Sequence, residues 1–313
     1  MIFSGLELMG EVPFRDVVIH SLIHAPSGGR MSKSLGTGMN PIAQIEAHGA
    51  DATRYGLMKM ASSQDVMFSE GAIEEGAKLA NKLWNASRLL IEAAVSEADA
   101  RPASLEEHWI LARLSATQGA VEGYLAEFDF AHLVSELYRL TFDDFCDWYL
   151  EAIKPRIYGG DADAVATAGA ALERLLKLLH PVMPHVTEEI WSYLPERKTR
   201  LIVTRWPERA DEASAGALER VQEAATIFRR SGVLARLEGD EKRIFDAVVK
   251  PDRAPVAGNG NVEQERERLL KEIARAERQL ANERFVDKAP ADVVAAEREK
   301  LERYRRELAA ISE

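Results

Sequence analysis

An apolar period of three and four residues runs through residues 74–195 and restricts this long stretch to helices. Leu79, Leu83, Ala86 and Leu90 recur at steps of 4, 3 and 4, which places them on one helix face. The same spacing recurs in three later runs: Ile110 to Phe128, Leu133 to Trp148, and Val165 to Leu179. Proline and glycine fall mostly between the runs. The pattern predicts a mainly α fold built on an antiparallel bundle of four or five helices.

The residues before the bundle carry a mixed pattern. Residues 16–23 (DVVIHSLI) form a near-continuous run of β-branched and other apolar residues, which predicts a buried strand. A glycine-rich turn follows this run, and residues 40–61 read as short helices broken at Gly49. We therefore expect a separate region over residues 1–73, followed by the bundle over 74–208.

The residues after the bundle predict a small mixed region and a charged arm. Residues 200–206 (RLIVTRW) favour a strand, Ala217 to Phe228 favours a helix, and residues 251–261 have the composition of a linker. Apolar residues then recur in heptads over 262–313, with a proline-containing turn between two short helical runs. This predicts a small region and linker over 209–261 and an antiparallel coiled-coil hairpin over 262–313.

Charge and cysteine content exclude several classes of protein. The 40 Lys and Arg against 51 Asp and Glu give a net charge of −11, which argues against a generally cationic nucleic-acid coat but leaves room for a local basic face. A single cysteine, Cys146, excludes an intramolecular disulfide framework and is expected to be a buried, unreactive residue. No apolar run is long enough for a membrane span and no signal peptide is recognisable, so we expect a cytoplasmic protein without a membrane partner.

The most informative local motif is GGRMSKSLG, residues 28–36. Arg30, Ser32, Lys33 and Ser34 place two cations and two hydroxyl groups on a short loop flanked by glycines. Such a loop can present a lysine to a phosphate as a compact point charge. A solvated surface loop is the ordinary explanation for an arbitrary sequence of this kind.

The surroundings of this loop favour the phosphate-binding interpretation. RMSKS resembles the KMSKS signature of class I aminoacyl-tRNA synthetases, with Arg30 in place of the first lysine. Residues 81–90 (NKLWNASRLL), 147–158 (DWYLEAIKPRIY) and 180–191 (HPVMPHVTEEIW) are similar to the anticodon-binding helical domain of that family. Residues 280–301 (LANERFVDKAPADVVAAEREKL) resemble the C-terminal arm of its valyl branch. The resemblance covers most of the chain and is weakest over residues 209–257.

The resemblance implies a fold and a reaction. Residues 1–73 would be the end of a Rossmann-like catalytic domain, followed by the anticodon-binding bundle and a tRNA-binding arm. The reaction would attach valine to tRNA(Val) with ATP and its Mg²⁺ as co-substrate and no protein-bound metal. The loop would close over ATP, with Lys33 as the catalytic cation. The implied ATP-binding residues are Arg30, Met31, Ser32, Lys33 and Ser34.

The resemblance also implies RNA contacts on the bundle. The candidate tRNA-binding residues are Trp84, Asn85, Arg88, Lys154 and Arg156. Base stacking and phosphate pairing are the chemistry that these residue types supply. For Trp84 itself a core position is the favoured interpretation, because it follows Leu83 on the apolar stripe.

Two other groups of residues resemble metal sites only superficially. His180, His185 and Glu188 have prolines between the two histidines, so a structural helix junction is favoured over a metal site. Asp143, Asp144 and Asp147 are expected to form a solvated or ion-paired helix face.

The histidine motif of the other half of a class I active site does not occur around any of the seven histidines, and no editing domain is recognisable. We therefore expect no valine activation by this chain alone. It would be one half of a split enzyme that pairs with an N-terminal synthetase half, or a truncated product or an incomplete record. The alternatives are a non-catalytic tRNA-binding module, an isoleucyl relative, and a coiled-coil scaffold.

Overall fold

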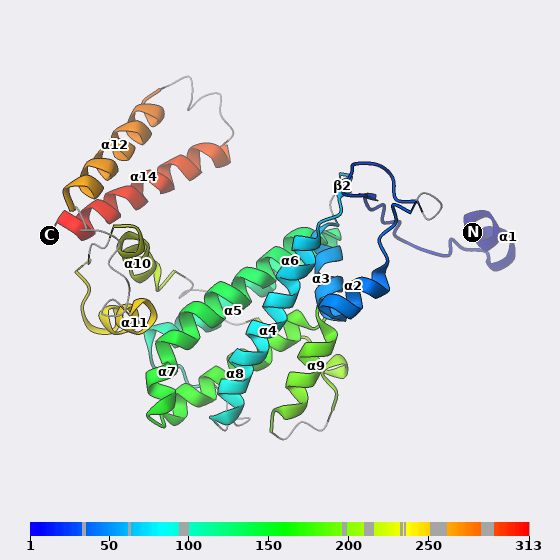
Figure 1. The fold of residues 1–313 in the computed structure, drawn as a ribbon, viewed down its shortest axis with the longest axis horizontal. Helices are drawn as coiled ribbons and strands as arrows, with labels where there is room; N and C mark the ends of the chain where they lie inside the picture. The colour runs from blue at the N-terminus through cyan, green and yellow to red at the C-terminus, as the bar shows by residue number, and fades with distance from the viewer. Residues whose placement is uncertain are drawn as a thin grey trace.

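The computed structural model describes residues 1–32, 36–61, 64–93, 100–195, 199–209, 216–231, 234, 236–250, 262–282 and 291–312. The chain is mainly helical, as predicted (Figure 1). The N-terminal helix and the C-terminal helical hairpin lie toward opposite ends of the long axis, and the bundle lies between them.

The central bundle consists of helices that follow one another closely along the chain. They are α4 (Glu70–Glu92), α5 (Leu105–Glu127), α6 (Phe130–Arg139), the π-helix η1 (Leu140–Leu150), α7 (Glu151–Tyr158), α8 (Ala162–Leu179) and α9 (Pro184–Tyr193). α6, η1 and α7 join without a break, so the bundle has five helical rods, within the predicted number. Leu79, Leu83 and Leu90 of the predicted α4 face are all fully buried.

Side-chain caps explain where the bundle helices begin. Ser69 accepts a hydrogen bond from the Ala72 amide at the start of α4, and Asp161 accepts from two amides at the start of α8. At the start of α5 the Ser104 amide donates to the carboxylate of Glu107. Each cap satisfies amides that have no partner inside the helix.

Helices α2 (Pro41–His48) and α3 (Ala50–Lys59) join the N-terminal region to the bundle. α3 lies against α4 at glycine positions: a Cβ at Gly56 would be 2.6 Å from Ile73 Cγ1, and one at Gly76 would be 2.9 Å from the Tyr55 Cβ. These two glycines therefore set how closely α3 and α4 approach. The contact fixes α3, and with it Arg54, against the bundle.

The region before α2 has little regular structure. It contains α1 (Ile2–Met9), and strand β1 (Ile23–His24) pairs in parallel with β2 (Val66–Met67). The predicted buried strand over 16–23 is wrong: only Ile23 of that run is in a strand, and Ile19 is 90% exposed. A buried strand needs neighbours on both sides, and among the described residues β1 has only β2.

The residues after α9 also differ from the prediction. Residues 200–206 do not form a strand; Leu201–Val203 is the 3₁₀-helix η2, with Leu201 buried and the rest of the turn largely exposed. The predicted helix over 217–228 corresponds to α10 (Glu219–Ser231), and α11 (Gly239–Val249) follows it. A second helix therefore occupies a region for which the sequence favoured mixed structure.

Helices α12 (Val262–Leu280) and α14 (Ala291–Ser312) form the predicted antiparallel hairpin (Figure 1). Leu269, Ala276, Val294 and Leu301 lie in its buried seam. Arg305 of α14 pairs with Glu277 of α12 at 2.8 Å, which is a cross-helix contact of the kind that sets pairing in coiled coils. The turn between the helices, residues 283–290, lies outside the described residues.

Candidate functional site

The loop that contains the RMSKS motif begins at the carboxyl end of β1. The Ala25 amide donates to the Gly29 carbonyl at 2.8 Å, and Gly28 has φ +87°, a conformation that favours glycine. Further along, the Ser32 amide donates to Thr37 Oγ1 at 3.0 Å and the Thr37 amide donates to the Ser32 carbonyl at 3.1 Å. These bonds tie residues 32 and 37 together, the two positions that flank residues 33–35 of the motif.

The predicted catalytic residue, Lys33, falls between these two positions in the sequence. Lys33, together with Ser34, lies outside the described residues. Arg30 is exposed at the entrance to the loop, and Met31 and Ser32 are half-buried at its base. Carboxyl ends of parallel strands are the usual ligand-binding edge of α/β sheets. The position of the loop therefore suits a phosphate-binding role.

A pair that sequence reasoning missed supports the start of the loop. Asp65, just before β2, accepts hydrogen bonds from the Leu22 amide at 2.8 Å and from His24 Nε2 at 3.1 Å. The Leu22 and His24 hydrogen bonds lower the pKa of the Asp65 carboxyl below its usual value. The contact holds β1 and β2 in register directly before the loop. The two residues are 41 apart in sequence, so no local signal could have revealed the pair.

Trp84, Asn85 and Arg88 lie toward the C-terminal end of α4. The Trp84 ring is half-buried and meets Tyr193 of α9 edge-on, with ring centroids 5.9 Å apart. Asn85 and Arg88 are exposed, and Arg88 pairs with Glu92 at 3.7 Å on its own helix. Trp84 therefore combines a packing role with a partly accessible ring, beside an amide and a guanidinium that face solvent.

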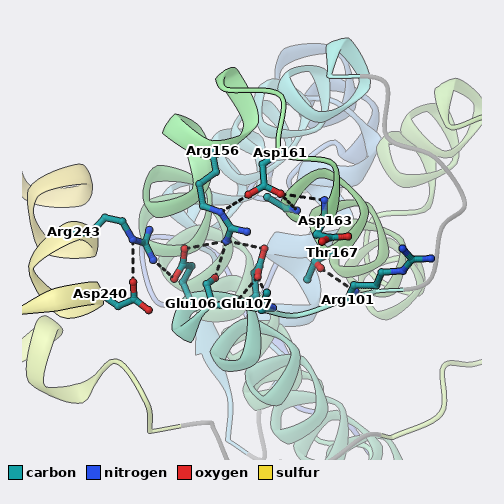
Figure 2. A network of polar contacts seen from close by, with 12 residues as sticks. Arg101, Glu106, Glu107, Arg156, Asp161, Asp163, Thr167, Asp240 and Arg243 are labelled. Atoms are coloured by element: carbon teal, nitrogen blue, oxygen red, sulfur yellow. Dashed lines mark hydrogen bonds and ion pairs between the residues drawn. The ribbon is translucent and has the colours of Figure 1, made fainter.

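Arg156 lies in a buried network of charges (Figure 2). Its guanidinium pairs with Glu107 and Asp161, each at 2.9 Å, and its side chain is 20% exposed. Burial works against its charge, but hydrogen bonds and the charges of these carboxylates raise the pKa of Arg156 above its usual value. The arginine neutralises carboxylates inside the protein. Lys154 pairs with Glu151 on the same helix and remains partly accessible.

The same network attaches α11 to the bundle. Arg243 of α11 donates to the fully buried Glu106 of α5 at 2.9 Å and also pairs with Asp240 (Figure 2). A buried carboxylate needs a counter-charge, so this contact fixes α11 against α5. Nothing in the sequence marks the pair, because the partners are 137 residues apart.

The residues that resemble metal ligands have structural partners. The amides of His185 and Val186, at the start of α9, donate to the carboxylate of Asp51 at 3.1 and 2.6 Å. Glu188 accepts from the Leu201 amide at 2.9 Å. No group of three or more potential metal-binding side chains occurs among the described residues.

The acidic run on η1 is ion-paired. Asp144 pairs with Arg113 at 3.0 Å and Asp147 with Lys82 at 2.5 Å, while Asp143 is exposed. Burial raises the pKa of the Asp144 carboxyl above its usual value against the opposing effect of Arg113. Cys146 is buried beside them. The run is therefore a partly ion-paired and partly solvated helix face, as the sequence predicted.

Comparisons with known proteins now add to this geometry. The model of the family described as tRNA synthetases class I (I, L, M and V) matches residues 1–114, and that of the anticodon-binding domain of tRNA ligase matches residues 107–242. The model described as the valyl tRNA synthetase tRNA binding arm matches residues 261–313. The chain belongs to the class I aminoacyl-tRNA synthetases.

Curated relatives place it within this family beside the valine–tRNA ligases. It is 34% identical to the valine–tRNA ligase of Carboxydothermus hydrogenoformans over 98% of this chain and 42% of the relative. It is also 34% identical to the enzyme of Enterococcus faecalis over 100% of this chain and 43% of the relative. The chain thus spans less than half the length of these relatives.

A solved synthetase structure agrees on the fold. The ternary complex of the Agrobacterium radiobacter K84 LeuRS with tRNA and LeuAMS matches with a TM-score of 0.54 and 20% identity, over 67% of this chain and 26% of that one. At this identity the match concerns the arrangement of helices alone. Among the described residues of this synthetase chain, no helix is both long and apolar enough to cross a bilayer.

Proposed function

We propose that this chain serves the ATP-dependent attachment of valine to tRNA(Val). The observation that carries the proposal is the family match at residues 261–313, a valyl-specific arm, in a chain that is 34% identical throughout to valine–tRNA ligases. In the proposed reaction the carboxylate of valine attacks the α-phosphorus of ATP and releases pyrophosphate. The valyl group then passes from the adenylate to the terminal ribose of the tRNA.

The RMSKS loop is the proposed contribution of this chain to the first step. Negative charge gathers on the departing pyrophosphate, and Lys33 would neutralise it there. Arg30 would add a second phosphate contact, and Met31, Ser32 and Ser34 would shape the loop around ATP and its Mg²⁺. The bonds between Ser32 and Thr37 support this role, because they hold the base of the loop in place.

The proposed RNA surface lies on the C-terminal half of α4 and the adjoining end of α9. The edge-on pair of Trp84 and Tyr193 offers an aromatic surface for base stacking, and Asn85 and Arg88 offer exposed polar groups. Lys154 adds a cation on α7. The arm would brace the outer corner of the tRNA.

We also propose that the N-terminal region pairs with an N-terminal synthetase half. α1 and the segment after it expose large apolar residues, with Phe3 76% and Leu8 81% exposed. Exposed apolar surface of this extent marks an interaction site. Such a half would supply neighbours for β1 and the part of the active site that contacts valine.

The test is equilibrium binding of the purified chain to valine tRNA and to a panel of other tRNAs across a salt series. Selective, salt-sensitive binding to valine tRNA is the expected result, since phosphate contacts release counter-ions. Equal, weak binding to all tRNAs would contradict the proposed specificity for valine tRNA. Addition of an N-terminal half then separates the enzyme from a non-catalytic tRNA-binding module, because only the enzyme should regain aminoacylation.

A further inference from the structure

Among the described residues, two of the cavities outside the loop and the α4 surface differ in the charge of their lining. The larger, about 670 Å³, lies between α10 and the arm. Four carboxylates and four cations line it, and they neutralise one another: Arg306 pairs with Glu223 at 3.1 Å, and Arg268 with Glu307 at 3.5 Å. A charged ligand would have to displace these pairs, so this cavity is a junction between helices.

The smaller cavity, about 440 Å³, lies where α3, the turn between α8 and α9, and η2 meet. Arg54, Lys177 and Arg205 line it, together with the apolar surfaces of Ile202 and Trp206. None of the described residues that line it is acidic. In a chain with a net charge of −11, this local excess of cations is the opposite of the average surface.

Among the described residues, backbone carbonyls and not a carboxylate hold the Arg54 guanidinium in position. Its Nε donates to the Val182 carbonyl at 3.2 Å and its Nη2 donates to the Pro181 carbonyl at 3.0 Å. A guanidinium has five N–H donors, so three remain available while the group stays fixed. A guanidinium that is held in a fixed orientation and keeps its full positive charge is well suited to bind a phosphate group.

The other two cations of the cavity, Arg205 and Lys177, differ in whether a carboxylate neutralises them. Arg205 is exposed and has no ion-pair partner among the described residues. Lys177 pairs with Glu173 at 2.7 Å and lies 5.8 Å from the centre of the Trp191 ring. The two arginines therefore carry the uncompensated charge of the cavity.

His180 contributes a neutral acceptor. The hydroxyl of Thr187 donates to the Met183 carbonyl at 2.8 Å, so at the 2.8 Å contact with His180 its oxygen accepts a hydrogen bond from Nδ1–H. Nε2 is then the unprotonated nitrogen, and it is buried without a hydrogen-bond partner among the described residues, 4.0 Å from the carboxylate of Glu188. Burial lowers the pKa of His180 and favours this neutral form. A hydroxyl or amino group of a ligand would satisfy Nε2.

Trp206 adds a flat apolar surface. Its Nε1 donates to Glu122 at 2.8 Å, which fixes the indole, and the ring remains 38% exposed. Ile202, 68% exposed, lines the same cavity. An aromatic face beside fixed cations is the combination that binds a base and its phosphate together.

We propose that this cavity, centred on Arg54, Arg205 and Trp206, binds one nucleotide unit of an RNA strand. The phosphate would contact the two guanidinium groups, and the base or ribose would lie against Trp206 and Ile202. The cavity volume of about 440 Å³ is within the range of small-ligand pockets. The proposal rests on the proposed tRNA-binding function and adds to the bundle a contact at its junction with α3, separate from Trp84.

The test compares Arg205→Gln with Arg200→Gln in the full chain. Both arginines are exposed and lie on the same segment, but only Arg205 lines the cavity. Arg205→Gln should weaken tRNA binding about tenfold and reduce the slope of log affinity against log salt by about 1. Arg200→Gln should leave both values unchanged, and neither variant should alter thermal unfolding. AMP, titrated by NMR, is the probe for a free nucleotide.

Each outcome has a defined meaning. A loss of tRNA affinity in Arg205→Gln that Arg200→Gln does not share supports the cavity as an RNA site. An equal or larger loss in Arg200→Gln overturns the cavity proposal. If Arg205→Gln weakens AMP binding but leaves tRNA binding intact, the ligand is a free nucleotide and the RNA assignment is overturned. If wild type binds tRNA, both variants match it and AMP does not bind, the cavity proposal fails while the proposed function stands. If wild type binds neither tRNA nor AMP, both fail.

Discussion

Helices α4 and α1 are both rich in apolar residues, yet the chain buries only one of them. In α4, Leu83 is 0% exposed and contacts the bundle core, whereas in α1 Leu8 is 81% exposed. The α4 residues recur on one face and meet other rods of the same chain. The apolar residues of α1 meet no such surface among the described residues. An apolar pattern therefore shows a tendency to be buried, and the partner decides whether burial occurs.

The same contrast applies to how the parts are attached. α11 is fixed to the bundle through Glu106, a fully buried carboxylate paired with Arg243. The arm meets α10 through Arg306 and the carboxylates Glu219 and Glu223, in which the arginine is half-exposed. Exposed pairs stabilise a structure weakly and are screened by salt. The bundle and α11 should therefore unfold together, and the arm should separate more easily.

The largest expected effect is functional and lies in the sparsely packed N-terminal region. In a mixture of this chain with the N-terminal part of a valine–tRNA ligase, Lys33→Ala should slow valine-dependent ATP–pyrophosphate exchange about a hundredfold to a thousandfold. The reason is the loss of the cation that neutralises the departing pyrophosphate. The control is Lys78→Ala, on an exposed position of α4.

This prediction separates function from stability in that region. The melting temperature of the Lys33→Ala chain should equal that of wild type, because the proposed role of Lys33 is to contact ATP and not to pack against the rest of the chain. A large fall in melting temperature would show that the loop is part of the fold and would contradict its proposed position. Exchange activity by wild type without the N-terminal part would contradict the proposal of a missing half.

The second prediction exchanges one leucine in each region. Leu83→Ala should lower the free energy of unfolding by about 3 kcal/mol, since it leaves a cavity in a closed core. Leu8→Ala should change it by less than about 0.5 kcal/mol, since the side chain is already in solvent. Urea unfolding followed by circular dichroism measures both. Equal effects would mean that α1 packs against the rest of the chain in solution, and would contradict the contrast between a buried α4 and an exposed α1.

The third prediction concerns the arm. Leu301→Asp places a charge in the buried seam between α12 and α14, and should separate the hairpin while the bundle remains folded. The affinity for tRNA should fall about tenfold if the arm supplies a few charge-assisted contacts. Arg298→Gln, at an exposed position of α14, is a matched surface control. Unchanged affinity in Leu301→Asp would refute the role of the arm.

The sequence predicted the helices whose apolar faces pack against another part of the same chain. The α4 face, the apolar positions Ile110, Leu114 and Val121 of α5 and the hairpin seam follow from spacing alone, because each side chain meets another part of this chain. Phe128 did not follow the pattern: it lies at the end of α5 with φ 57° and is 44% exposed. The strands over 16–23 and 200–206 were wrong because strand formation depends on neighbours that local sequence does not reveal.

The residues of the candidate site differ in the same way: some could be found from local sequence, and others could not. The RMSKS loop was recognisable because its cations and glycines are adjacent in sequence, and Trp84, Asn85 and Arg88 because they lie within one helical turn or so. The role of Arg156 was not recognisable, since its partners Glu106 and Glu107 lie about fifty residues away on α5. The cavity at Arg54 combines residues from three separate segments. Charge networks of this kind appear only when the fold is known.

The smallest expected effect uses the single cysteine of the chain, which lies in the bundle. Burial raises the pKa of the Cys146 thiol to about 12, against about 8.5 for an exposed thiol. Folding therefore favours the protonated thiol. The full contribution of the thiol to the free energy of unfolding is present below about pH 8.5. It is lost progressively as the pH rises toward 12, because over this range only the thiol of the unfolded chain ionises.

At pH 9 the loss should be about 0.8 kcal/mol, measured as the difference in pH dependence between wild type and Cys146→Ala. The subtraction removes the contributions of buried tyrosines, which both proteins share. Reaction with a thiol reagent sharpens the comparison of the two regions. Cys146 should react only on unfolding, whereas a cysteine introduced by Leu8→Cys in the Cys146→Ala background should react at once, since position 8 is in solvent. Fast labelling of Cys146 in the folded chain would show that the bundle opens locally and is less closed than α4 and its neighbours indicate.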